Sequence, residues 1–361
     1  MPGLDELSDD LKRNTRGRFE QWVKNPKCDA NTISAVLNVR LSAVAEKLSY
    51  EPNYAQSPFA IQRGNAFEKS LFYDDARELV TALTKAAAIS TEDTKFIDFR
   101  LRLNGGSRVN SVDEALAESV KFLKALPESD QRDTLVVAAL TIRIPKGVML
   151  PEATLVIDAL TAVKDDVGWL LTVGEVKVFP DRGGHTDPAE IATARAQAGV
   201  YVHALDLALQ TLKISQQIRI NRRGFLVFTK PGTNRPIVRA DEDLTYQAIR
   251  ADTGFDRLDA IAQALLAEGI PAESTDQLLE FVAHSKTHFE DSCWAFCDLA
   301  ARCFDIALAD DSPMVLGRDS AAHLGGITVT RAVELLNGAD PEDEMESTLQ
   351  VLMRNSDWHM P

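Results

Sequence analysis

The most constraining feature of this sequence is a β-rich stretch in its central third. Three runs rich in Val, Ile, Leu and Thr, separated by turn-forming residues, lie between Leu135 and Phe179: LVVAALTIRI, ATLVIDALTAV and WLLTVGEVKVF. Such runs are typical of strands. A predicted helix over residues 188–212 and two further strand-like runs, IRINRRGFLVF and RPIVRA, follow. This order predicts an α+β fold with a mixed central sheet of about five strands.

Helix-rich sequence flanks the predicted sheet on both sides. Apolar residues recur with helical spacing over most of the first 50 residues, over residues 60–89, over residues 108–126 and through residues 243–309. We therefore expect an N-terminal helical segment (1–62), a core (63–240) with a helical insertion at about 90–134, a C-terminal helical segment (241–309) and an acidic extension (310–361).

The charge of the chain is strongly negative, with 39 Lys and Arg against 54 Asp and Glu and a net charge of −15. This balance argues against a protein that coats nucleic acid by bulk electrostatics, but it permits a local basic track. No acidic residue occurs from Leu207 to Ala240. That segment is either a phosphate-binding surface or a set of solvated strand edges, and its basic residues are Lys213, Arg219, Arg222, Arg223, Lys230, Arg235 and Arg239.

The apolar runs are too short to span a membrane, and the first residues are charged where a signal peptide would be apolar. We therefore expect a cytoplasmic protein without a membrane partner. Four cysteines are an ordinary number for this length and are unlike a disulfide framework.

Two carboxylates and a lysine lie on consecutive predicted strands. Asp158 lies in VIDAL, and Glu175 and Lys177 lie in GEVKVF. Because side chains alternate along a strand, Glu175 and Lys177 share a face, and pairing of the two strands would set Asp158 beside Glu175. Paired carboxylates suit a hard divalent cation such as Mg²⁺ or Mn²⁺. The alternative is an exposed row of ion pairs on a half-buried sheet.

Two further motifs bracket these strands. Glu68 follows Gly64 by four residues in RGNAFE, and Gln197 precedes Tyr201 by four residues in QAGVY, which places both on one helical face. The ordered set of Gly-x-x-x-Glu, strand Asp, Glu-x-Lys and Gln-x-x-x-Tyr resembles the RecB-type branch of the PD-(D/E)XK nucleases. The resemblance covers the segment from Arg63 to Tyr201.

This resemblance implies a restriction-endonuclease-like α/β/α core and metal-dependent hydrolysis of phosphodiester bonds. Asp158 and Glu175 would be catalytic metal ligands, the Val176 carbonyl would contribute, and Lys177 would orient water or stabilise developing charge. Glu68 would be a further metal ligand where this branch commonly has His. Gln197 and Tyr201 would hold DNA or the active-site loop, or would serve in packing. The DNA-binding residues expected from the basic track are Arg219, Arg222, Arg223 and Lys230.

The cysteines occur in a one-plus-three arrangement, with Cys28 early and three others in DSCWAFCDLAARCF. This arrangement, Cys28 with Cys293, Cys297 and Cys303, resembles the iron–sulfur subset of RecB-type nucleases, which includes CRISPR-adaptation nucleases and AddB-like subunits. The resemblance implies a [4Fe–4S] cluster that joins the N-terminal and C-terminal helical parts. An unbroken helix would separate Cys293 from Cys303 by about 15 Å, so the chain must bend between them. The alternatives are a zinc site that includes His284 and His288, and four unlinked buried thiols.

The function implied by these motifs is a DNA nuclease, an exonuclease or end-processing enzyme acting on single-stranded DNA or duplex ends. CRISPR adaptation, other antiviral defence and DNA repair are the expected settings, with a helicase or an integrase as candidate partners, because the sequence has no ATP-binding loop. A nuclease-fold protein that binds DNA or scaffolds a complex without cutting is the alternative.

Overall fold

A computed structural model describes residues 21–22, 24–52, 58–90, 94–102, 105–106, 109–129, 134–143, 154–269 and 274–355. These residues fall into two compact units. Segments Gln21–Ala55 and Ile270–Pro361 belong to a helical unit, whereas Gln56–Gly269 belongs to a unit that contains the sheet. The helical segments from the two ends of the chain therefore come together in one unit.

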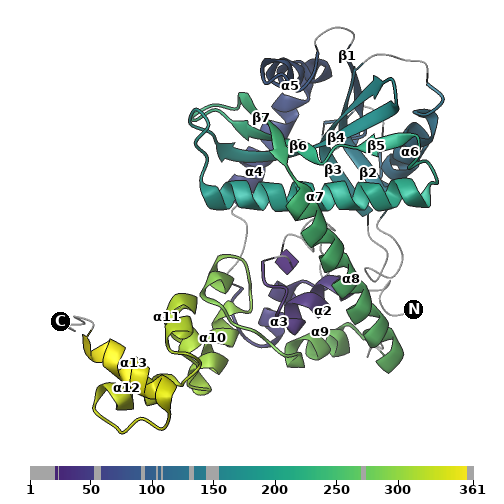
Figure 1. Cartoon of the computed structure of the whole chain (residues 1–361). Helices are drawn as coiled ribbons and strands as arrows, with labels where there is room; N and C mark the ends of the chain where they lie inside the picture. The colour runs from purple at the N-terminus through teal and green to yellow at the C-terminus, as the bar shows by residue number, and fades with distance from the viewer. Residues whose placement is uncertain are drawn as a thin grey trace. The chain divides into compact units, whose positions relative to one another are not determined.

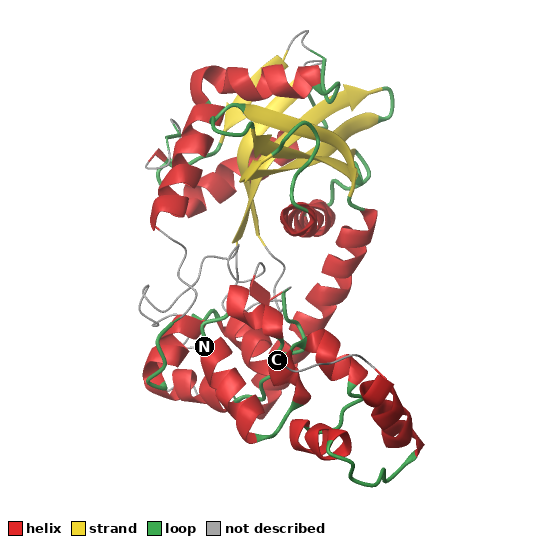
Figure 2. Cartoon of the chain, turned by 90° about the vertical axis from the view of Figure 1, so that its left-hand side faces the viewer, coloured by secondary structure: helices red, strands yellow, loops and turns green. Residues whose placement is uncertain are grey.

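The sheet is mixed and contains seven described strands, shown in yellow in Figure 2. Their order is β1-β2-β3-β4-β6-β7, and β5 also pairs with β4. The β1–β2, β4–β5 and β4–β6 pairs are parallel, and the other pairs are antiparallel. These findings confirm the α+β class and the mixed sheet. The strands are β1 (Thr94–Asp98), β2 (Thr134–Arg143), β3 (Thr154–Asp165), β4 (Gly168–Pro180), β5 (Ile218–Ile220), β6 (Arg223–Thr229) and β7 (Pro236–Asp243).

The described sheet has seven strands, two more than the predicted number of about five. The run IRINRRGFLVF contains both β5 and β6, because the chain leaves the sheet at Asn221 and Arg222 between them. The strand β1 lies within residues 90–134, which we predicted as a helical insertion, and α6 (Val112–Ala125) is the helix there. That prediction was therefore only partly correct. The Ser111 side chain caps α6 by accepting a hydrogen bond from the Glu114 backbone N–H.

Helices cover both faces of the sheet (Figure 1). On one face, α4 (Pro58–Leu71) and α5 (Tyr73–Lys85) pack Phe67, Leu79 and Leu83 against strand residues that include Val176 and Val227. On the other face lies α7 (Pro188–Thr211). The Asp187 side chain caps α7, and Pro188 occupies its first turn, where a missing N–H costs nothing.

The helix α8 (Thr245–Glu268) packs against α7, crossing it at a steep angle (Figure 1), and belongs to the sheet unit. We had grouped these residues with the C-terminal helical segment of 241–309. Gly199 explains the close approach, because a Cβ there would lie 2.4 Å from the Cβ of Gln247 on α8. The boundary between the units therefore lies after α8 rather than before it.

The corner between α4 and α5 has an unusual backbone. Asp74, Asp75 and Ala76 have φ values of 53°, 52° and 55°, so three consecutive residues with side chains adopt the left-handed conformation. This conformation costs about 1–2 kcal/mol per residue. Burial of Ala76 and Leu79 in the core offsets part of that cost.

The helical unit combines the N-terminal and C-terminal helices. The backbone N–H of Ala30 donates to the Lys286 carbonyl, and Lys47 pairs with Asp276. Asn38 adopts the left-handed conformation and separates the helix Asp29–Leu37 from the helix Leu41–Lys47. The elements are α2 (Asp29–Leu37), α3 (Leu41–Lys47), α9 (Thr275–His284), η3 (Asp291–Ala295), α10 (Ala300–Ala309), η4 (Pro313–Leu316), α11 (Arg318–His323), α12 (Val329–Leu336) and α13 (Glu344–Asn355).

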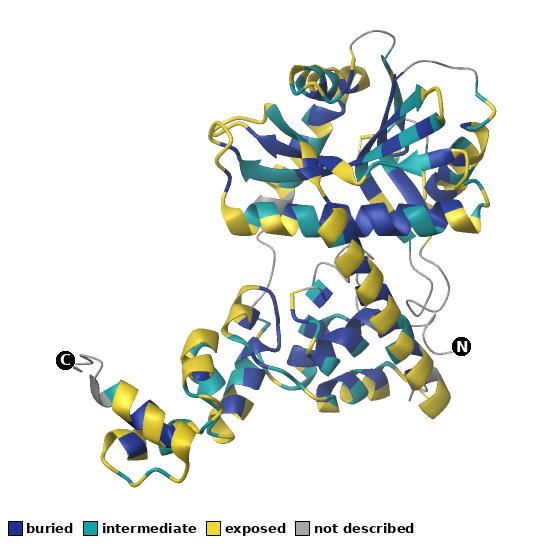
Figure 3. Cartoon of the chain, in the orientation of Figure 1, coloured by how far each residue is buried: buried dark blue, intermediate teal, exposed yellow. Residues whose placement is uncertain are grey.

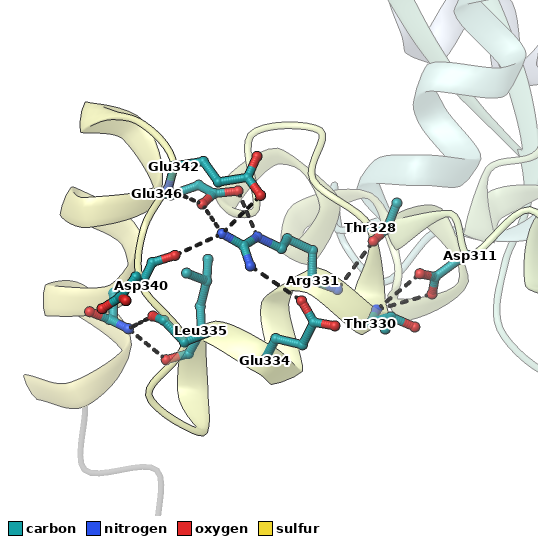
Figure 4. A network of polar contacts seen from close by, with 11 residues as sticks. Asp311, Thr328, Thr330, Arg331, Glu334, Leu335, Asp340, Glu342 and Glu346 are labelled. Atoms are coloured by element: carbon teal, nitrogen blue, oxygen red, sulfur yellow. Dashed lines mark hydrogen bonds and ion pairs between the residues drawn. The ribbon is translucent and has the colours of Figure 1, made fainter.

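The last two helices are held together by an arginine (Figure 4). Arg331 on α12 donates to both carboxylate oxygens of Glu346 on α13, at 3.0 and 2.6 Å, and to Glu334 at 3.2 Å. It also donates to the Asp340 carbonyl at 3.0 Å. Much of this hairpin is exposed (Figure 3), so the ionic contacts compensate for a small apolar core.

Candidate active site and cysteine cavity

Asp158 lies where the ladder of the sheet is interrupted on both sides. The pairs between β3 and β4 run from Asp165↔Gly168 to Ala159↔Gly174, immediately before Asp158 would meet Glu175. On the other side, β2 pairs through Ala138 and Leu140 but skips Ala139, which has a φ of 55°. The strands therefore leave room at Asp158 for interactions other than backbone pairing.

The Asp158 carboxylate uses that room to join β4 to α7. One oxygen accepts a hydrogen bond from the Val176 backbone N–H at 3.1 Å, and the other accepts one from the Tyr201 hydroxyl at 3.3 Å. Asp158 is half-buried, whereas Tyr201 is fully buried. The α7 helix therefore fixes the orientation of this carboxylate.

Glu175 and Lys177 lie on the same face of β4, as the strand period requires. The Lys177 Nζ lies 2.9 Å from Glu175 Oε1, and the side chains are 14 % and 0 % exposed. Lys177 also donates to Gln197 Oε1 at 2.7 Å, and Gln197 Nε2 donates to the Tyr201 hydroxyl at 2.8 Å. A continuous chain of polar contacts thus connects Glu175 to Asp158 through Lys177, Gln197 and Tyr201.

The charges in this network are not balanced among its own members. Two carboxylates face one ammonium group in a largely buried position, and burial of a charge is costly unless an opposite charge lies close by. A cation bound beside the two carboxylates would add positive charge to this network. The oxygen donors of Asp158 and Glu175 fit a hard divalent cation by their chemistry. Among the described residues, no group of three Cys, His, Asp or Glu could hold a metal ion in its present arrangement.

Glu68, the expected third carboxylate, is not brought into one group with the other two. It is half-buried on α4, where its neighbour Phe67 packs against Ala159 and Val176. Because successive strand residues face opposite sides, Phe67 meets the face of the sheet opposite to Asp158 and Glu175.

The basic residues of segment 207–240, the predicted basic track, do not all lie on one surface. Arg219, Arg222 and Arg223 lie at or before the beginning of β6, whereas Lys230 follows its end, about 20 Å away for a strand of this length. Each arginine also has an acidic neighbour from outside the segment: Asp165 for Arg219, Asp206 for Arg222 and Asp241 for Arg223. The sequence pattern missed these partners because they lie on other elements.

A second buried ionic group, which sequence reasoning missed, positions the start of α7. Glu242 is 7 % exposed and accepts hydrogen bonds from Arg195 at 2.6 Å and from Arg239 at 3.0 Å. Arg239 also donates to the Gly184 carbonyl at 2.9 Å. Buried Asp181 accepts a hydrogen bond from the Gly184 N–H at 2.6 Å. The loop after β4, which contains Gly183 and Gly184, is therefore held by hydrogen bonds at Gly184. The spacing of its residues in the sequence did not indicate these contacts.

The four cysteine side chains line one small buried cavity of the helical unit, with a volume of about 10 Å³. The chain bends between Cys293 and Cys303, because η3 ends at Ala295 and α10 begins at Ala300, as the spacing requires. Burial raises the pKa of all four thiols, and that of Cys303 to about 11. None of them forms a disulfide.

The neighbours of the cavity bear on the zinc alternative. His288 lines the cavity, and Asn25 donates to the Cys293 sulfur at 3.4 Å. His284 ends α9 and is exposed, with its ring bonded to the Glu280 carbonyl. His288 lies beyond the end of α9, so the two histidines do not share a helical face, and His284 is not among the cavity residues.

Comparison of the chain with models of protein families, with curated proteins and with solved structures finds no match. Among the described residues, the helices are too short or too polar to cross a membrane.

Proposed function

We propose that this chain is a metal-dependent DNA nuclease with a restriction-endonuclease-like core of the RecB type. The observation that carries the proposal is the continuous network of Asp158, Glu175, Lys177, Gln197 and Tyr201. Three separate sequence motifs predicted these residues, and they come from two strands and one helix. An incidental row of surface ion pairs would not require a buried Gln and Tyr to connect it.

The roles of the residues follow from their contacts. Asp158 and Glu175, with the Val176 carbonyl, would hold Mg²⁺ or Mn²⁺, and the cation supplies Lewis-acid and water-activating chemistry when bound. Lys177, held by Glu175 and Gln197, places a positive charge beside the site, where it would stabilise negative charge that develops on a phosphate. Tyr201 keeps the Asp158 carboxylate oriented.

The cysteine cavity supports a [4Fe–4S] cluster as a structural group of the same protein. Four thiolates are the ligand number of such a cluster, and four thiols line the cavity. Its small volume means that the sulfur atoms must separate when a cluster binds. Cys28 comes from the N-terminal segment and the others from the C-terminal segment, so a cluster would fasten the two ends of the helical unit together.

The test of the nuclease proposal is Mn²⁺-dependent digestion of labelled single-stranded DNA. We expect Asp158→Asn, Glu175→Gln and Lys177→Met each to lower the rate at least about 100-fold, because each removes a charge from the site. The matched controls are Asp165→Asn, on the same strand but exposed, and Lys121→Met on the surface of α6, which should keep the rate of the unaltered protein.

The non-cutting scaffold gives a different result in the same experiment. An unaltered, folded protein that binds the DNA but leaves it intact with either Mg²⁺ or Mn²⁺ would refute the nuclease proposal and support the scaffold. Equal cleavage by Asp158→Asn and by the unaltered protein would instead show that this carboxylate site is not the catalytic one.

A further inference from the structure

The outer side of the α4–α5 corner contains a pocket that the proposed cleavage site does not use. Its volume is about 340 Å³, and it is lined by side chains of both helices, including Lys69, Ser70, Tyr73 and Arg77. Ligand pockets in proteins have volumes of about 300–1,000 Å³. The pocket is therefore large enough for a nucleotide unit.

The aromatic ring of Tyr73 lines this pocket and is largely exposed to solvent. The Tyr73 side chain is 74 % exposed, although large aromatic side chains contribute most when they are buried. It comes directly before the three left-handed residues Asp74, Asp75 and Ala76. Backbone strain of this kind concentrates at functional sites. The corner thus presents a ring on a fixed backbone, which suits stacking against a planar group.

The charged groups of the pocket favour a ligand that carries both a ring and a phosphate. Lys69 forms no ion pair with any residue that the structure describes. Arg77 pairs with Asp74 at 3.0 Å, but both side chains are mostly exposed, so this pair is weak and Arg77 can contact a phosphate instead. Asp74 and Glu78 balance the two cations, so stacking rather than bulk charge must supply most of the affinity.

The pocket belongs to the same unit as the carboxylate site. The inner side of α4 packs Phe67 against Val176, on the face of the sheet opposite to Glu175, while Lys69 and Ser70 on its outer side line the pocket. We propose that this pocket binds one nucleotide of single-stranded DNA, with the base stacked on Tyr73 and the phosphate near Lys69 and Arg77. The proposal rests on the proposed nuclease function, because that function supplies DNA as the ligand.

The test is the affinity of the full chain for a short fluorescein-labelled poly-dT oligonucleotide, measured by fluorescence anisotropy in EDTA so that no cleavage occurs. Removal of a stacking ring typically weakens binding, so we expect Tyr73→Ala to raise Kd about 5- to 100-fold. Tyr73→Phe keeps the ring and should stay within about twofold of the unaltered protein. The matched control is Tyr246→Ala, which removes a similarly exposed tyrosine on α8 and should have no effect.

The outcomes separate the two proposals. If Tyr73→Ala binds as tightly as the unaltered protein, the pocket proposal is overturned, and Mn²⁺-dependent cleavage by the unaltered protein still decides the nuclease proposal. If Tyr73→Ala and Tyr246→Ala weaken binding equally, stacking at this pocket is also refuted. If the unaltered protein neither binds nor cuts DNA, both proposals fail.

Discussion

At the scale of single residues, hydrogen bonds strongly alter the titration of the Glu346 carboxyl group. Its hydrogen bonds with Arg331, and then with the Glu342 backbone, lower its pKa from 4.5 to about 2. A carboxyl whose pKa is lower in the folded state stabilises the fold above its unfolded pKa. That contribution is lost as the pH falls from about 4.5 towards 2.

We therefore expect Glu346→Gln to loosen the α12–α13 hairpin at pH 7, because it leaves Arg331 without its main partner. The difference from the unaltered protein should shrink as the pH falls through this window. Amide hydrogen-exchange protection of α12 and α13, compared at pH 7 and pH 3, measures the effect. Glu344→Gln on the exposed side of α13 is the control. Equal loss of protection at both pH values would contradict the assignment.

Residue-level sequence patterns predicted two contacts of the candidate site, because short-range geometry sufficed for them. The period of two along a strand placed Glu175 beside Lys177, and the four-residue spacing placed Gln197 beside Tyr201. Sequence could not show that α4, which contains Glu68, packs its Phe67 against the opposite face of the sheet. It also could not show the acidic partners of Arg219 and Arg223, because those contacts depend on tertiary structure.

At the scale of elements, the contact between α7 and α8 depends on a glycine. A Cβ at Gly199 would lie 2.4 Å from the Gln247 Cβ and 2.7 Å from its carbonyl carbon, so the two helices would have to separate. We expect Gly199→Ala to destabilise the sheet unit by about 1–3 kcal/mol, as overpacking does. Thermal unfolding followed by circular dichroism measures the change.

The matched control for Gly199→Ala is Gly64→Ala on α4, where a Cβ would meet no atom within 4 Å. Alanine favours helix over glycine by about 0.5–1 kcal/mol, so this variant should be slightly more stable than the unaltered protein. A stabilising effect of Gly199→Ala would show that α8 does not pack on α7 as closely as described.

Element boundaries were predictable only where the pattern was long. The strands β2, β3 and β4 and the helix α7 were found because each has ten or more residues of consistent composition. The strand β1 has five residues, including Lys95 and Asp98, and joins the sheet through parallel pairing with a distant strand. Such pairing leaves no local signal. The sequence predicted β5 and β6 as one strand, because apolar residues both precede and follow the break between them.

At the scale of the whole molecule, the cysteine cavity connects segments that lie more than 260 residues apart. We expect Cys28→Ala to lower iron from about four atoms per anaerobically purified chain to below one, since a cluster that lacks one ligand is poorly held. It should also release the N-terminal helices to proteolysis. Trp294→Phe, which alters a neighbour of Cys293 but no ligand, is the control. Full iron content in Cys28→Ala would exclude Cys28 as a ligand.

The division of the molecule into units was only partly predictable from the sequence. The one-plus-three cysteine pattern predicted that both ends of the chain meet, and the helical unit does combine them. The assignment of α8 to the sheet unit was missed because its sequence is as helical as that of the C-terminal segment. Only its packing on α7 distinguishes it.

The most direct test of the central claim is one anaerobic preparation of the full chain, assayed for iron and for Mn²⁺-dependent digestion of single-stranded DNA. We expect a brown protein with about four irons per chain that degrades the DNA, and an Asp158→Asn variant with the same iron content that does not. A folded protein that leaves DNA intact, whatever its iron content, would contradict the nuclease proposal.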